Sequence, residues 1–144
     1  MEILAKALRV DAVVPTFAHD GDAGCDLIAV DTYTLRAGGG RALVATGLSI
    51  AIPPGYGGFV LPRSGLAAQH GVTCSNAPGL IDAGYRGELK VALVNLDPDH
   101  DYVVRPGDRV AQLVVLEVPS VHFREVDQLP PSNRGDGGFG SSGR

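Results

Sequence analysis

Short apolar runs separated by turn-forming residues are the feature that most constrains how this chain can fold. Clusters of Gly, Pro and Asp interrupt the sequence, for example at residues 53–55 (Pro-Pro-Gly) and 97–99 (Asp-Pro-Asp), and such clusters favour tight turns. This spacing predicts an all-β sandwich or barrel, with a single short helix at residues 66–70. The expected strands, rich in Val, Ile and Leu, lie at residues 3–10, 27–30, 42–52, 58–61, 89–96, 102–104 and 110–118.

Two of these runs also indicate which side chains form the core. In the run at 89–96, apolar Leu89, Val91 and Leu93 alternate with other residues, so one face of this strand is expected to be buried. The run at 110–118 is almost continuously apolar. It therefore predicts burial on both faces, with a neighbouring subunit as one candidate cover.

The composition excludes several classes of protein. With 144 residues, 44% of them hydrophobic and 19% charged, the chain is long enough for one domain with its own core. No apolar run approaches the roughly 18 residues of a membrane-spanning helix, and a formal net charge of −4 argues against binding nucleic acid. Cys25 and Cys74 lack the spacing of a metal site or a disulfide framework, so we expect free thiols in a cytoplasmic protein.

Arg63 and Ser64 form the first of four polar segments that suit a phosphate-bearing ligand. They precede the predicted helix, where a guanidinium, a hydroxyl and the backbone N–H groups of a helix start can bind an anion. The alternative is an ordinary helix cap beside a surface arginine. The motifs of P-loop NTPases, zinc metalloproteases and serine hydrolases do not occur in the sequence.

The other polar segments of the body each carry a carboxylate or an amide. Asp82 follows apolar Leu80 and Ile81; a carboxylate beside apolar walls can act as a general base on water, or it can cap its own turn. Asp26 lies at the start of a strand, where it can orient a metal-bound water or cap a turn. Gln112 interrupts an apolar strand, and a buried amide needs partners, of which a phosphate oxygen is one.

The last fourteen residues, 131–144, are too rich in glycine and serine to fold on their own. They nevertheless include Arg134, Phe139, Ser141 and Ser142, groups that can close over a ligand carrying both phosphate and a flat ring. The other interpretation is a flexible, linker-like tail. The composition of the tail leaves both interpretations open.

Five segments of the chain, taken together and in order, resemble the motifs of the trimeric dUTP diphosphatase (dUTPase) family. They cover almost the whole chain, because the first begins at residue 23 and the last ends at residue 143. The motifs are Ala-Gly-Cys-Asp-Leu at 23–27, Pro-Arg-Ser-Gly-Leu-Ala at 62–67, Gly-Leu-Ile-Asp-Ala-Gly-Tyr-Arg-Gly-Glu at 79–88, Gly-Asp-Arg-Val-Ala-Gln-Leu at 107–113 and Arg-Gly-Asp-Gly-Gly-Phe-Gly-Ser-Ser-Gly at 134–143.

The resemblance implies a particular fold, assembly and reaction. The subunit would be an all-β, jelly-roll-like β-sandwich or barrel in a homotrimer with shared active sites. Residues 1–130 would form the β domain, and residues 131–144 a flexible Gly-rich arm that closes over the site. The reaction would be hydrolysis of dUTP to dUMP and pyrophosphate with Mg²⁺ as cofactor, with neither nucleic acid nor a membrane as partner.

The resemblance also implies roles for individual residues. Asp82 would activate the water that attacks the α-phosphorus, Arg134 would meet the outer phosphates, and Asp26 would orient a water on the Mg²⁺ that the triphosphate carries. Tyr85 would pack under the deoxyribose and leave no room for a 2′-hydroxyl. The remaining residues would bind the substrate: Arg63, Ser64, Gly65 and Gln112 the phosphates, Asn76 with the main chain of Leu80 and Ile81 the uracil edge, Phe139 the uracil face, and Lys90, Gly140 and Ser141 the surrounding pocket.

Two other functions compete with this interpretation. A dCTP deaminase on the same fold also has an Arg-Ser phosphate loop and an Ile-Asp hairpin. It needs, however, a glutamate in the strand after the hairpin to move protons, and the corresponding residue here is Ala92; the second serine of its phosphate loop is Gly65 here. A non-catalytic nucleotide-binding regulator would keep the phosphate contacts and lose the base, whereas Asp82 and Arg134 are both present.

Overall fold

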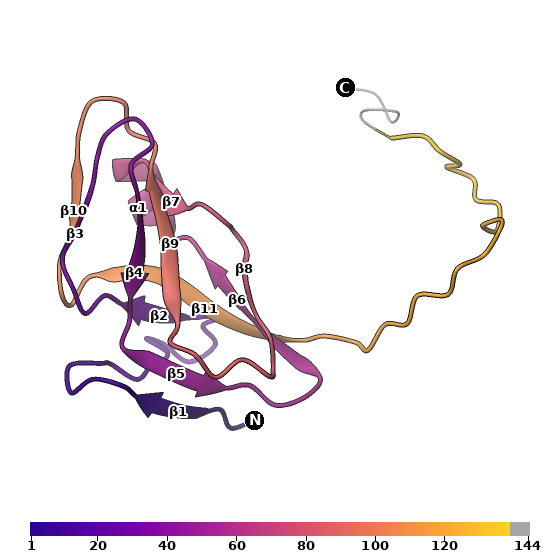
Figure 1. The fold of residues 1–144 in the computed structure, drawn as a ribbon, viewed down its shortest axis with the longest axis horizontal. Helices are drawn as coiled ribbons and strands as arrows, with labels where there is room; N and C mark the ends of the chain where they lie inside the picture. The colour runs from indigo at the N-terminus through magenta and orange to yellow at the C-terminus, as the bar shows by residue number, and fades with distance from the viewer. Residues whose placement is uncertain (139–144) are drawn as a thin grey trace.

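The computed structural model describes residues 1–138, and this part of the chain is almost entirely β-structure (Figure 1). The expected all-β class is therefore confirmed. The elements are β1 (Leu4–Ala7), β2 (Cys25–Ile28), β3 (Tyr33–Leu35), β4 (Arg41–Ala45), β5 (Leu48–Ala51), β6 (Tyr56–Leu61), α1 (Ser64–His70), β7 (Val72–Cys74), β8 (Gly79–Ile81), β9 (Lys90–Asn95), β10 (Tyr102–Val104) and β11 (Arg109–Glu117).

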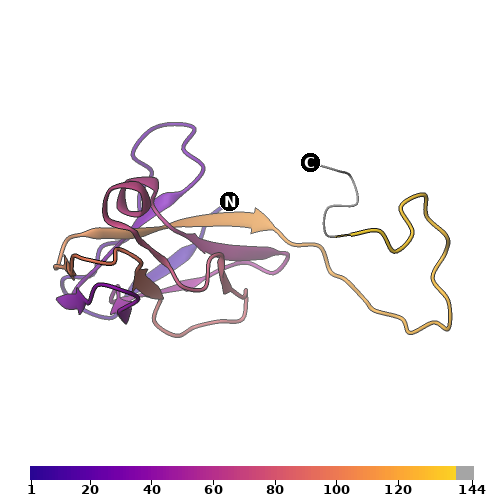
Figure 2. The ribbon, with the colours of Figure 1, turned by 90° about the horizontal axis from the view of Figure 1, so that it is seen from above.

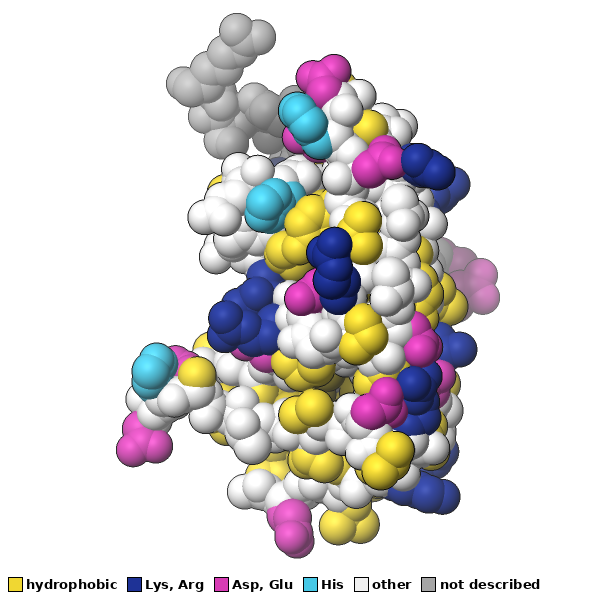
Figure 3. All heavy atoms as spheres, turned by 90° about the vertical axis from the view of Figure 1, so that its left-hand side faces the viewer, with side chains coloured by type: hydrophobic (Ala, Val, Ile, Leu, Met, Phe, Trp, Pro, Cys, Tyr) yellow, Lys and Arg dark blue, Asp and Glu magenta, His cyan; other side chains and the backbone are white. Residues whose placement is uncertain are grey.

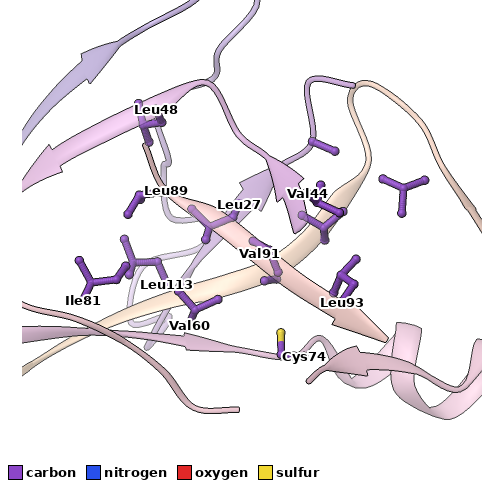
Figure 4. Close-up of a cluster of buried hydrophobic side chains, with 14 of the residues drawn as sticks. Leu27, Val44, Leu48, Val60, Cys74, Ile81, Leu89, Val91, Leu93 and Leu113 are labelled. Atoms are coloured by element: carbon purple, nitrogen blue, oxygen red, sulfur yellow. The ribbon is translucent and has the colours of Figure 1, made fainter. Parts of the chain in front are cut away.

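Two antiparallel sheets form the layers of a jelly-roll-like sandwich (Figures 1 and 2). One has the strand order β2-β11-β6-β8 and the other the order β4-β9-β7, with the pairs β1-β5 and β10-β3 at the ends. The core fills the space between the two sheets (Figure 4). Leu27, Val60 and Leu113 come from the first sheet, and Val91 and Leu93 from the second.

The burial of β9 and β11 agrees in large part with the sequence pattern. Leu89, Val91 and Leu93 are all buried, as their alternation predicts. In β11, Val110, Ala111 and Leu113 are buried. The pairing with β2 shifts register between Arg109 and Ala111, so the two adjacent buried residues lie at an irregularity of the strand rather than on two covered faces. The end of β11 differs, since Leu116 is 51% exposed in the single chain.

Several boundaries differ from the sequence prediction for local reasons. The run at 42–52 forms two strands, β4 and β5, because the chain turns at Gly47, whose φ of 66° is a left-handed conformation that favours glycine. Strands β3, β7 and β8 were not predicted. Each has only three residues and includes a Thr or a Gly that interrupts the apolar run, unlike β10, whose three residues are Tyr-Val-Val. The predicted helix begins two residues earlier, at Ser64, and ends at His70, as expected, with Gly71 as its C-cap.

The chain beyond β11 leaves the sandwich (Figures 1 and 2). A backbone hydrogen bond from Val118 to the carbonyl of Gly55 holds its start. From there to residue 138 the chain forms no strand or helix, and it exposes large apolar side chains such as Phe123, which is 98% exposed. Among the described residues no helix is both long and apolar enough to cross a membrane.

Asn95 is the polar residue whose loss should destabilise the sandwich most. It is fully buried at the end of β9; its amide donates to the carbonyls of Leu35 (3.1 Å) and His100 (2.8 Å) and accepts from the Asp97 N–H (3.0 Å). Asn95→Ala leaves these groups without partners, so we expect a loss of about 2–4 kcal/mol in urea denaturation.

The exposed control Asn133→Ala should change the free energy of unfolding by less than about 0.5 kcal/mol. An Asn95→Ala variant as stable as this control would contradict the assignment.

Candidate active site

A cavity of about 400 Å³ lies beside the loop that connects β8 to β9, a volume within the range of small-ligand sites. Most residues that line the cavity belong to the segment that runs from the end of β7 into β9. The loop from β8 to β9 is short, and side chains along it line one cavity. Six residues predicted from the sequence line the cavity: Asn76, Leu80, Ile81, Asp82, Tyr85 and Lys90.

Asp82 directly follows the buried end of β8 and is itself exposed at the cavity. The turn after it is closed by the backbone, because the Tyr85 N–H donates to the Asp82 carbonyl at 3.0 Å. The alternative role considered for the Asp82 carboxylate in the sequence analysis was to cap this turn. With the backbone closing the turn, this carboxylate is available to a water molecule.

The other polar groups of the cavity hold one another in place. The Tyr85 hydroxyl donates to the carbonyl of Glu88 at 2.9 Å. The Glu88 carboxylate accepts from the Gly47 N–H at 2.8 Å and forms an ion pair with Lys90 at 3.4 Å. The ion pair therefore holds Lys90 at the cavity wall, and the Glu88 carboxylate is itself bonded to the turn between β4 and β5 at Gly47.

Asp26, Arg63 and Gln112 form a second cluster on the sheet β2-β11-β6. Gln112 lies directly opposite Asp26 on one side and Leu61 on the other, so these side chains share one face of the sheet. Arg63, two residues beyond β6, places its Nε 2.9 Å from Asp26 Oδ1, and Arg109 lies 3.5 Å from Oδ2. Two guanidinium groups around one carboxylate leave a net positive charge that suits phosphate.

The two clusters lie apart within a single chain. Gly58 pairs with Ile81 and Val60 with Gly79 in an antiparallel ladder. Arg63 follows β6 and Asp82 follows β8, so they leave this ladder at opposite ends. Arg63, Ser64, Gly65 and Gln112 accordingly do not line the cavity that Asp82 lines.

The metal-shell candidate Asp26 follows a half-buried cysteine. The Cys25 thiol donates to the carbonyl of Leu113 at 3.6 Å, and burial raises its pKa. Cys25 and Cys74 are both free thiols, as expected. Since a thiol with a raised pKa is a poor nucleophile, Cys25 is expected to react slowly with alkylating reagents.

Of the predicted site residues in the segment 131–144, the structure describes only Arg134. Arg134 is exposed in a turn, where its Nε donates to the carbonyl of Gly137 at 2.8 Å. It does not line the cavity of its own chain. Phe139, Gly140 and Ser141 lie outside the described residues.

Glu88, Arg109 and Leu43 contact the two clusters without having been predicted. Glu88 and Arg109 belong to the third and fourth motifs, so their charge next to assigned residues was an available signal. Leu43 lines the cavity from β4, where it pairs with Ala92 of β9. Only the strand pairing reveals that contact.

A jelly-roll-like sandwich with a carboxylate-bearing cavity and a separate arginine cluster defines a candidate hydrolase of phosphate esters or anhydrides. The comparison with protein families identifies which one. The family model described as dUTPase matches residues 11–143. The chain belongs to the dUTPase family.

Individual relatives agree with this assignment. A deoxyuridine 5'-triphosphate nucleotidohydrolase of Streptomyces griseus is 52% identical over 143 residues, which cover 99% of this chain and 81% of the relative. One of Thermobifida fusca is 54% identical over 138 residues, covering 96% and 76%. A solved dUTPase of Staphylococcus bacteriophage 80alpha with dUPNHPP has a TM-score of 0.89 and 29% identity, with 99% of both chains covered.

Proposed function

We propose that this protein hydrolyses dUTP to dUMP and pyrophosphate. The observation that carries the proposal is the cavity in which Asp82 lies among Asn76, Tyr85 and Lys90, in a chain of the dUTPase family. In the proposed reaction the Asp82 carboxylate accepts a proton from a water molecule. The water oxygen forms a bond to the α-phosphorus, and the bond from this phosphorus to the bridging oxygen breaks, releasing pyrophosphate.

The phosphate chain is proposed to lie on the second cluster. Arg63, Ser64, Gly65 and Gln112 would bind its oxygens, and Arg63 is held in place by Asp26. Catalysis of this kind depends on positioning and on neutralising phosphate charge.

Mg²⁺ is proposed to enter together with the triphosphate. Residues 1–138 contain no group of three or more His, Cys, Asp or Glu that could hold a metal ion by themselves. The single carboxylate of Asp26 at the phosphate cluster fits an ion held mainly by the substrate, with Asp26 orienting one of its waters. The ion would supply neutralisation of phosphate charge.

The uracil is proposed to bind at the edge of a sheet. β8 is the last strand of its sheet, so the outer edge of Leu80 and Ile81 has main-chain groups available to pair with a base edge. Asn76 packs beside this edge, because its side chain lies next to Gly79. Tyr85 would then pack under the deoxyribose.

The separation of the two clusters supports a homotrimer with shared sites. Asp82 and Arg63 lie at opposite ends of one ladder, so a complete site needs a phosphate cluster from a second copy. The single chain also exposes apolar side chains that an interface would bury, and such side chains are visible in the lower half of the face in Figure 3. The exposed large apolar residues near the N-terminus are Met1, Leu4, Leu8, Val10, Val13, Val14 and Phe17.

Residues 131–144 are proposed to act as an arm over the site of another subunit, beyond a β domain formed by residues 1–130. The chain after β11 leads away from its own sandwich (Figure 1), which supports this placement. Arg134 would meet the outer phosphates, Phe139 would stack on the uracil, and Gly140 and Ser141 would complete the contact. The free thiols of Cys25 and Cys74 support a cytoplasmic, reducing location.

The reaction itself is tested by incubating the protein with dUTP and with dCTP and measuring pyrophosphate and ammonia. We expect pyrophosphate from dUTP and no ammonia from dCTP, because Ala92, at the position of the deaminase glutamate, contributes only a methyl group to the cavity wall. In ¹⁸O-labelled water the label should enter dUMP. Ammonia release would favour the deaminase, and nucleotide binding without either product would favour a regulator.

Tyr85→Ala should weaken discrimination against ribose. The side chain lines the cavity and is 45% exposed in the single chain, so a bound sugar can pack against it. Its loss should lower the ratio of kcat/KM for dUTP over UTP by about ten-fold, and lower dUTP turnover as well. An unchanged ratio would show that ribose is excluded elsewhere.

A further inference from the structure

The ring of Tyr85 lies directly over Gly87. A Cβ atom added at Gly87 would overlap the Tyr85 hydroxyl and lie 2.6 Å from its Cζ and 2.9 Å from its Cε2. These separations are far below ordinary van der Waals contact. The orientation of the Tyr85 ring therefore depends on the absence of a side chain two residues later.

The chain under the ring is held firmly in place. Ser49 is buried, and its hydroxyl donates to the Arg86 carbonyl at 2.8 Å. On the other side of Gly87, the Glu88 carboxylate accepts from the Gly47 N–H at 2.8 Å, and the Leu89 N–H donates to Leu48 at 2.7 Å. Because both flanks of Gly87 are bonded to residues 47–49, an added methyl group would displace the ring rather than the backbone.

We infer that Gly87 is a specificity-determining residue that positions the Tyr85 ring at the sugar subsite. With no side chain at 87, the ring can lie on the backbone and donate its hydroxyl to the Glu88 carbonyl at 2.9 Å. A methyl group breaks this contact and displaces the ring from the position in which it would exclude a 2′-hydroxyl. The inference rests on the proposed function, since the sugar subsite is that of dUTP.

The test compares Gly87→Ala with Gly84→Ala. Both glycines lie in the same loop, neither takes a left-handed φ, and a Cβ at Gly84 meets nothing within 4 Å. Gly87→Ala should raise the KM for dUTP and lower the ratio of kcat/KM for dUTP over UTP by about ten-fold or more. Gly84→Ala should change this ratio by less than about two-fold.

A double-mutant cycle shows whether Tyr85 transmits the effect. In a Tyr85→Ala background, Gly87→Ala should change the ratio by less than about two-fold, because the displaced ring is gone. An equal effect of Gly87→Ala in both backgrounds would overturn the inference. Equal dUTP/UTP ratios in Gly87→Ala and Gly84→Ala would also overturn it.

The cycle also covers a failure to fold. If Gly87→Ala alone melts far below the wild type, the Tyr85→Ala/Gly87→Ala protein should regain the melting temperature of Tyr85→Ala. A double variant that still fails to fold would overturn the inference, since the clash would then involve something other than Tyr85. If the wild-type protein does not hydrolyse dUTP, both the proposed function and the inference are overturned. The other contradicting results would overturn the inference alone and leave the proposed function intact.

Discussion

Asp82→Asn is expected to retain the fold and nucleotide binding and to lose kcat by about 10²–10⁴-fold. The amide has nearly the same size as the carboxylate but cannot accept a proton from water. The turn after residue 82 should persist, because it is closed by the backbone bond from Tyr85 to the Asp82 carbonyl. The measurements are single-turnover pyrophosphate release and calorimetric binding of a non-hydrolysable dUTP analogue.

Asp99→Asn provides the matched control, since Asp99 lies exposed in a turn outside the cavity. It should hydrolyse dUTP like the wild type. If Asp82→Asn were also within a few-fold of the wild type, another group would have to be the base.

Deletion of residues 133–144 is the second change with a large expected effect. Residues 133–136 are exposed, and the deletion includes only one large apolar side chain, Phe139. The melting temperature and the assembly should therefore change little. The deletion removes Arg134 and Phe139, and we expect turnover to fall by about 10³-fold or somewhat less, because arginines supplied to phosphoryl transfer contribute about 10³–10⁵ in rate and Mg²⁺ would share the charge.

Subunit mixing shows whose site the arm serves. Asp82→Asn subunits carry an intact arm, and the truncated subunits carry an intact Asp82. If the arm reaches a neighbouring subunit, a mixture of the two proteins should recover activity once subunits exchange. If each arm closes its own site, the mixture should stay inactive, and a truncated protein as active as the full chain would leave the arm as a linker.

The sequence predicts the fold well where a pattern is long enough to be periodic. The alternation of Leu89, Val91 and Leu93 correctly marks the buried face of β9. Strand β8 has only three residues and gives no such pattern. The break at Gly47 depends on one left-handed residue inside a run that is otherwise apolar.

The candidate site could be predicted only where its parts are close in sequence. Asp82, Tyr85 and Lys90 line one cavity because the short loop from β8 into β9 carries them. This loop is held by hydrogen bonds from Ser49 and Gly47, which are 37 and 41 residues away from their partners, and no local pattern indicates these bonds. The separation of Asp82 from Arg63 follows from the antiparallel pairing of β6 and β8. This pairing cannot be deduced from the order of the motifs along the chain.

Pyrophosphate release from dUTP, UTP, dCTP and dTTP by the wild-type protein tests the central claim most directly. The account predicts that kcat/KM for dUTP exceeds that for each of the others by at least about 100-fold, because the proposed subsites discriminate at the base edge and at the 2′ position of the sugar. Comparable values for two or more of these nucleotides would contradict it.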